Sequence, residues 1–215
     1  MLTKNVRTEC KTLCVLAMLV VSLPSARAIT TVAGINFQDN AFADTVISSS
    51  GSYTLVGAGT LASAVTGSGV NKFAYSSSAG AYIQLGFADN YLVNGTGYDL
   101  ALFEYGSAST FSLTIGGITH TYLSAGTGFT SVINGTTYQI NVAEINLDDF
   151  SVAVGTQLSS ITVGMDNSAN GVPTLGVAGA LNSALISGQS VPDAGASISL
   201  LGLAILGLGI FKRKI

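Results

Sequence analysis

The stretch Phe111–Tyr122, FSLTIGGITHTY, decides the fold class of this chain. Apolar and polar residues alternate in both of its halves, which is typical of two half-buried β-strands. The Gly116-Gly117 pair between them permits the positive φ angles of a two-residue hairpin turn. Such a turn pairs Ile115 with Ile118, Leu113 with His120 and Phe111 with Tyr122. The sequence therefore predicts a hairpin with one buried face, on which His120 is half-buried, and one face of Ser and Thr.

The rest of the central region continues this pattern. A second hairpin is predicted at Asn134-Gly135, between strands at 129–133 and 136–142. Further strands are expected at 82–87, at 98–104 as a central strand buried on both faces, and at 160–165. Short strands between frequent Gly, Ser, Thr and Asn residues favour an all-β fold, a single β-sandwich or jelly roll over residues 29–175. Residues 176–190 are expected to form a last strand or a linker.

The charge distribution excludes one class of partner. Residues 29–190 contain nine acids and a single base, Lys72, so this body has a charge of about −8 (one minus nine). Nucleic-acid binding requires a basic surface, and this body lacks the residues to form one. Both cysteines, Cys10 and Cys14, precede the body, which is therefore predicted to fold without a disulfide.

The N-terminus has the three parts of a secretory signal peptide, predicted over residues 1–28. Lys4, Arg7 and Lys11 form a basic region, and residues 12–23 form a short apolar one. Ala26 and Ala28 supply the small residues that signal peptidase accepts, so cleavage is expected between Ala28 and Ile29. The alternative is a lipoprotein signal with Cys14 as the lipidated residue, but the residues before Cys14 are not the small ones that such processing needs.

The C-terminus reads as a short motif, an apolar span and a basic tail. The motif is Val191, Pro192, Asp193, Ala194 and Gly195, and the tail is formed by Lys212, Arg213 and Lys214 within residues 212–215. Residues 194–211 number 18, or about 27 Å as a helix, which nearly matches a hydrocarbon core of about 30 Å. A basic cluster after a span marks the cytoplasmic side, so we expect a transmembrane helix over 194–211 with the body outside the cytoplasm.

This arrangement over residues 191–215 resembles the PEP-CTERM class of sorting signals, and specifically the VPDSG-CTERM variant found on exosortase substrates. Ala194 stands where the variant has Ser. The resemblance implies insertion in the inner membrane, recognition of residues 191–195 by an exosortase-type enzyme, and release to the cell surface or extracellular matrix of a bacterium. A permanently anchored single-pass protein is the alternative. A sortase signal would need Leu-Pro-x-Thr-Gly, and a GPI signal ends without a basic cluster.

A second resemblance covers residues 80–104 of the body. Asp89-Asn90, then Asn94-Gly95, then Asp99-Leu100 and Phe103-Glu104 are similar to a stretch that recurs in exported bacterial proteins of this sorting class. Those domains are taken for galactose-binding-like sandwiches. The resemblance implies a fold class and no activity.

The same stretch contains the candidate ligands for a metal. Asp89, Asn90, Asn94 and Asp99 offer oxygen atoms beside a Gly-rich loop, the ligand type that calcium prefers. Asp and Asn are also ordinary turn residues, and strand alternation places Asp99 and Glu104 on opposite faces. Calcium is the one cofactor that the sequence suggests.

The sequence does not contain a pattern that indicates catalysis. His120 is the only histidine, and no Gly-x-Ser-x-Gly motif accompanies it. Asp148 and Asp149 are adjacent, whereas a glycosidase needs two carboxylates that flank one bond. The expected function is therefore that of a non-enzymatic surface or matrix protein. A carbohydrate-binding module is the alternative, with extracellular polysaccharide as its partner.

Overall fold

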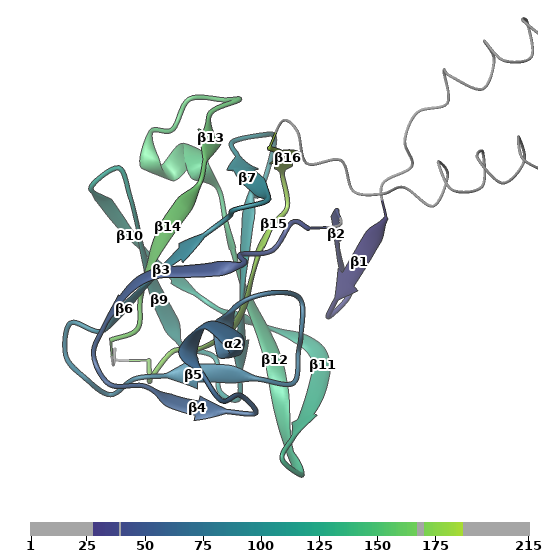
Figure 1. The fold of residues 1–215 in the computed structure, drawn as a ribbon, viewed down its shortest axis with the longest axis vertical. Coiled ribbons are helices and arrows are strands. Elements are labelled where there is room, and N and C mark those ends of the chain that lie inside the picture. The colour runs from purple at the N-terminus through teal and green to yellow at the C-terminus, as the bar shows by residue number, and fades with distance from the viewer. Residues whose placement is uncertain (1–27, 39, 167–169, 187–215) are drawn as a thin grey trace, which may run out of the picture. The chain divides into compact units, whose positions relative to one another are not determined.

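The computed structural model describes residues 28–38, 40–166 and 170–186, and strands dominate this part of the chain (Figure 1). The strands are β1 Ile29–Val32, β2 Ile35–Gln38, β3 Thr45–Ser50, β4 Thr54–Val56, β5 Phe73–Tyr75, β6 Tyr82–Gly86, β7 Asn90–Val93, β8 Leu100–Tyr105, β9 Thr110–Ile115, β10 Ile118–Leu123, β11 Ala125–Ile133, β12 Thr136–Ile145, β13 Gln157–Leu158, β14 Ser160–Gly164, β15 Thr174–Ala180 and β16 Ser183–Leu185. The helical segments in these ranges are short, the α-helix α2 Leu61–Val65 and the 3-10 helix η1 Leu147–Phe150. The all-β prediction is confirmed.

The described strands form antiparallel sheets that share one core. A five-stranded sheet has the order β10-β9-β14-β6-β3, and a six-stranded sheet has the order β11-β12-β8-β15-β5-β4. β1 pairs with β2, and β13-β7-β16 form a separate three-stranded sheet. Leu113 and Val163 of the five-stranded sheet belong to the same hydrophobic cluster as Phe103 and Val177 of the six-stranded one. Two sheets that share a core make this a sandwich-like body.

Both hairpins predicted from turn chemistry are present, and the first has the predicted register. β9 and β10 pair Ile115 with Ile118, and Gly116 and Gly117 have φ angles of 58° and 82°. β11 and β12 turn at Asn134 and Gly135, with φ angles of 50° and 80°. The half-buried state predicted for His120 is wrong, because β10 is an edge strand and His120 is exposed.

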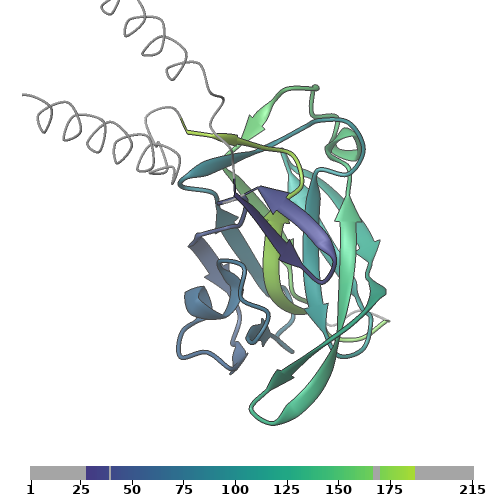
Figure 2. The same cartoon turned by 90° about the vertical axis from the view of Figure 1, so that its right-hand side faces the viewer.

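β8 is the central strand that the sequence predicts. All six of its residues are buried, and it pairs with β12 on one side and β15 on the other. The β1–β2 hairpin lies over the six-stranded sheet (Figure 2), where the rings of Phe37 and Phe103 are 5.9 Å apart. Tyr105 stacks on Phe73 at 5.4 Å. These aromatic rings cover a face of β8 that would otherwise meet water.

β15 lies beside β8, so the core extends to Ala180. Its residues are small because aromatic rings press against it. A Cβ on Gly176 would lie 2.2 Å from Tyr105 Cε2, and one on Gly179 would lie 2.6 Å from Phe37 Cε1. The small side chains of this strand therefore make room for the large ones of its neighbours.

Candidate functional site

The residues predicted to bind calcium separate into two groups, and Asp99 anchors the first. Asp99 is fully buried immediately before β8. Its Oδ1 accepts hydrogen bonds from Gly95 N at 2.7 Å and Asn182 Nδ2 at 2.8 Å, and its Oδ2 accepts one from Leu147 N at 2.8 Å. Three N–H donors satisfy this carboxylate, so its geometry is that of a structural clamp between three loops.

Asn94 belongs to the same group and serves a neighbouring loop. Its Nδ2 donates to Asp148 Oδ1 at 2.8 Å and to the Val152 carbonyl at 2.6 Å, so it holds the segment that follows β12. Asn94 is 1% exposed, and its Oδ1 is buried without a hydrogen-bond partner.

Asp89 and Asn90 form the second group, at the start of β7. Here the neighbour is Asp44, which precedes β3 and which the sequence did not single out. Asp44 Oδ2 accepts from Ala88 N at 2.8 Å and from Asp89 N at 3.2 Å. Burial of the Asp89 carboxyl raises its pKa to about 6, and hydrogen bonding of the protonated carboxyl to Asp44 and the negative charge of Asp44 act in the same direction. The carboxyl groups of Asp44 and Asp89 are therefore close to each other. Local sequence patterns do not reveal this proximity, because 45 residues separate the two.

No group of three or more His, Cys, Asp or Glu side chains within the described ranges is arranged around a common point.

Glu104 is a buried carboxylate that the sequence analysis left without a role. It is fully buried in β8 and accepts hydrogen bonds from the backbone and hydroxyl of Ser109 and from the hydroxyl of Ser124. Thr174 N approaches Glu104 Oε1 at 3.4 Å. The carboxylate ties the loops on either side of the β9–β10 hairpin to β8. Asp99 and Glu104 are thus two separate buried carboxylates, and each holds a different set of loops by its hydrogen bonds.

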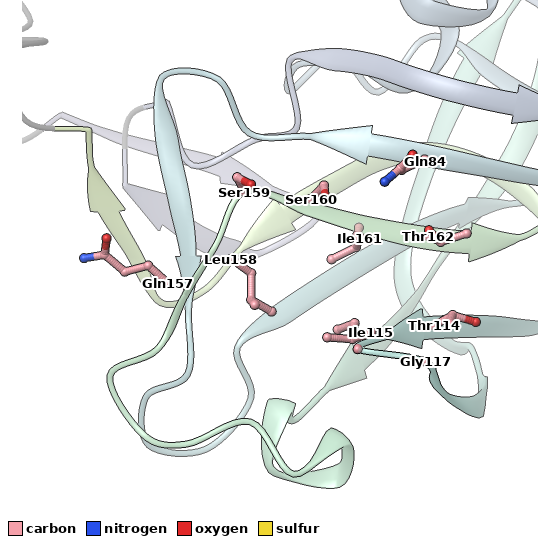
Figure 3. Close-up of a pocket in the computed structure, with 11 residues that line it drawn as sticks. Gln84, Thr114, Ile115, Gly117, Gln157, Leu158, Ser159, Ser160, Ile161 and Thr162 are labelled. Carbon is pink, nitrogen blue, oxygen red and sulfur yellow. The ribbon is translucent and has the colours of Figure 1, made fainter.

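A groove of about 400 Å³ lies on the five-stranded sheet (Figure 3). It is lined by uncharged residues from β6, β9, the following turn, β13 and β14, namely Gln84, Thr114, Ile115, Gly116, Gly117, Gln157, Leu158, Ser159, Ser160, Ile161 and Thr162. Hydroxyl and amide groups supply its hydrogen-bonding capacity, and Leu158, Ile115 and Ile161 supply its apolar wall. The chemistry of this lining suits a neutral polar ligand.

The groove contains part of a row of polar side chains that crosses all five strands. Thr162 of β14 is in register with Thr114 on one side and with Gln84 on the other. The row continues through hydrogen bonds, from Thr114 Oγ1 to Thr119 Oγ1 at 2.8 Å and from Ser48 Oγ to Gln84 Oε1 at 2.9 Å. Adjacent strands are about 4.8 Å apart, so the row spans roughly 19 Å. The Ser48 contact fixes the Gln84 amide with its nitrogen free to donate.

The residues considered for catalysis make packing and hydrogen-bond contacts between β10 and η1. His120 packs edge-on against Phe150, with ring centroids 5.1 Å apart. Asp148 and Asp149 are exposed in η1, and Asp149 Oδ2 accepts a hydrogen bond from the Tyr122 hydroxyl at 2.8 Å. These contacts hold β10 against η1.

Both processing segments lie outside the described residues, apart from Ala28 and Ile29. Ala26, the motif at 191–195, the predicted span at 194–211 and the basic residues Lys212, Arg213 and Lys214 belong to the part of the chain that is not described. Within the described ranges, no helix has the length and apolarity needed to cross a bilayer.

Comparison with known proteins identifies the C-terminal segment. A family model described as the VPDSG-CTERM motif matches residues 190–215. Comparison with curated proteins and with solved structures gave no match. The resemblance of the body to galactose-binding-like domains therefore stays a prediction. The matched segment is similar to the sorting signals of exported proteins, so the motif indicates an exported protein that carries a C-terminal sorting signal.

Proposed function

We propose that this chain is a non-enzymatic component of the bacterial cell surface or extracellular matrix, delivered there by cleavage of its C-terminal signal. The match of the VPDSG-CTERM motif to residues 190–215 carries the proposal. In this account signal peptidase removes residues 1–28, and residues 194–211 hold the precursor in the inner membrane. An exosortase-type enzyme then cuts at or near residues 191–195.

The local chemistry of the motif supports recognition by a processing enzyme. Pro192 lacks a backbone N–H and disfavours helical geometry at Val191, so the motif is expected to stay extended in front of the span. The span has 18 residues and contains glycines at 202, 207 and 209, which weaken a helix. Both features suit a segment that is cut and left in the membrane.

A pair of variants tests the processing step in a host with the matching exosortase. Wild type and Pro192→Ala/Asp193→Ala are each tagged at an exposed position of the body, such as the Asn134-Gly135 turn. Wild type should shorten and reach the surface, and the variant should stay at full length in the inner membrane. A variant with Lys72→Ala serves as the control, because it alters the body and leaves the motif intact. If wild type and the motif variant have the same size and location, the C-terminal segment is a permanent anchor and not a processed signal.

A second function, binding of a neutral extracellular polysaccharide, is favoured by the groove in the five-stranded sheet. Its lining residues carry no charge, and the described body has eight acids against one base, Lys72, which disfavours anionic polymers. Hydroxyl and amide rows match the hydrogen-bonding groups of a sugar chain. Tyr82, two residues before Gln84 on β6, is 37% exposed and offers an aromatic ring on the same face.

Affinity electrophoresis of the full chain in detergent through gels with neutral or anionic polysaccharides tests this function. Retardation by a neutral polymer should weaken in Gln84→Ala and Gln157→Ala. Gln139→Ala is the matched control, because Gln139 is exposed on β12 of the other sheet. Equal retardation of all variants, or retardation by anionic polymers alone, would exclude the groove as the site.

A further inference from the structure

The two main sheets have four edge strands, and three of these have features that hinder pairing with another chain. The pairing of β3 shifts register after Val46, and the pairing of β11 shifts after Gly126. β4 is only three residues long. Bulges and short strands are common ways in which proteins protect a sheet edge. β10 is the fourth edge strand, and its six residues pair with β9 without a shift.

β10 also lacks the charged residues and prolines that protect exposed edges. The sequence from residue 105 to residue 143 contains no Asp, Glu, Lys, Arg or Pro, and this range includes all of β10. The carboxylate of Asp149 accepts a hydrogen bond from the Tyr122 hydroxyl, but it does so on the inner face of the sheet, since Tyr122 is in register with the buried Phe111. The outer edge of β10 is therefore uncharged.

Half of the backbone groups of β10 point away from β9. The two-residue turn at Gly116-Gly117 makes Ile115 and Ile118 a hydrogen-bonded pair, so every second residue from Ile118 onward bonds to β9. The residues between them direct their N–H and C=O groups outward, namely Thr119, Thr121 and Leu123. Within the described ranges, no backbone hydrogen bond outside the β9 pairing involves residues 118–123.

We propose that β10 pairs with β10 of a second copy of this chain, antiparallel and about a two-fold axis at Thr121. In this register the outward-facing groups overlap fully, because Thr121 opposes Thr121 and Thr119 opposes Leu123. Three hydrogen-bonded pairs with two bonds each give about six backbone hydrogen bonds. Residues of the same face oppose each other, so the five-stranded sheets of the two copies join into one continuous sheet.

The charge distribution favours a second copy as the partner. The described body has eight acids against one base, so two copies repel each other wherever their acidic surfaces approach. β10 is a surface where two copies can meet without this repulsion, because pairing it with itself opposes neutral residues to neutral residues. Leu123, which is 63% exposed, would then lie against Thr119 of the second copy.

The size of this contact determines its strength. A standard interface takes about 20–30 residues from each side, whereas β10 contributes six. We therefore expect a weak dimer, with a dissociation constant above about 1 μM in solution. Copies tethered to one surface reach local concentrations of about 1 mM, at which weak pairing is populated.

The inference adds a partner to the proposed role at the cell surface. Pairing through β10 does not require cleavage at residues 191–195, so the unprocessed chain tests it. A failure of pairing and a failure of processing are therefore distinguishable.

Site-specific cross-linking of the full chain in detergent tests the register, in a background that carries Cys10→Ala and Cys14→Ala. Thr121→Cys should give a covalent dimer with a short bismaleimide, because opposed Cα atoms of a hydrogen-bonded pair are about 5.5 Å apart. Thr54→Cys is the matched control, since Thr54 is exposed on β4, an edge strand of the other sheet. Equal dimer yields from the two variants would overturn the proposal, as would no dimer from Thr121→Cys at about 1 mM protein.

Sedimentation equilibrium over a range of protein concentrations gives a second readout. Thr121→Lys should raise the dissociation constant of the dimer at least about tenfold, because two ammonium groups then meet at the two-fold axis. Thr54→Lys should leave it unchanged. A dimer that survives equally in both variants would assign association to another part of the chain and overturn the proposal. A melting temperature of Thr121→Lys within about 2 °C of wild type shows that the variant is folded.

Discussion

Replacing Asp99 with Asn should destabilise the body strongly, although the change removes only a charge and exchanges one oxygen for nitrogen. Asp99 is fully buried and accepts hydrogen bonds from Gly95 N, Asn182 Nδ2 and Leu147 N, at 2.7, 2.8 and 2.8 Å. In Asp99→Asn the remaining oxygen keeps the first two bonds without charge assistance. The new NH₂ group faces the N–H of Leu147, where donor meets donor.

The size of the effect follows from these contacts. A hydrogen bond to a charged group contributes about 1.5–3 kcal/mol, and a buried donor left unpaired costs about 1–3 kcal/mol. One bond to Leu147 is lost outright and two are weakened, so we expect a loss of about 3–4 kcal/mol. For a body of this size that loss lowers the melting temperature by about 6–16 °C.

Far-UV circular dichroism of the full chain in detergent measures this shift. Glu144→Gln is the matched control, because it removes an exposed carboxylate from β12 and should change the melting temperature by less than about 2 °C. If Asp99→Asn melts within about 2 °C of wild type, the three-donor clamp does not stabilise the body as described.

Three further changes test other parts of the core by the same measurement. Tyr105→Phe should leave stability unchanged or raise it by up to about 1 kcal/mol, because the Tyr105 hydroxyl is buried without a partner; clear destabilisation would show that the hydroxyl is satisfied. Gly176→Ala should destabilise by about 1–3 kcal/mol, since its Cβ would meet the Tyr105 ring at 2.2 Å, whereas Gly59→Ala meets no atom within 4 Å and should be tolerated. The folded state holds the proton of Asp89 more tightly than the unfolded chain does, because burial and then Asp44 raise its pKa from 3.8 to about 6. Stability from this group is therefore full below about pH 4 and lost as the pH rises through 6, and Asp89→Asn should remove that part of the pH dependence.

The local features of the fold were predictable because their determinants are local. Gly116-Gly117 and Asn134-Gly135 determine the geometry of the two turns. The geometry of each turn in turn determines the register of the two strands that flank it. The run of apolar residues in β8, interrupted only by Glu104, likewise indicated a strand with two buried faces. The position of β15 was less evident, because Gly176 and Gly179 are small for a reason that lies in the rings of Tyr105 and Phe37, far away in sequence.

The residues that the sequence predicted as calcium ligands show the same limit. Asp89 and Asn90 were singled out because they are neighbours in a polar stretch, and so were Asn94 and Asp99. Tertiary structure separates the two groups and brings Asp44 to the first. No spacing rule links residues 44 and 89, because their contact depends on how β3 and β6 pair. The exposure of His120 was mispredicted for a related reason, since hairpin register does not tell which strand is the sheet edge.

The intact mass of the protein recovered from the surface of the producing bacterium shows whether both ends of the chain are removed. Processing at both ends predicts a polypeptide that begins at Ile29 and ends at or near residues 191–195, without the span and without Lys212, Arg213 and Lys214. A surface protein whose mass includes the chain through Ile215 would contradict the account.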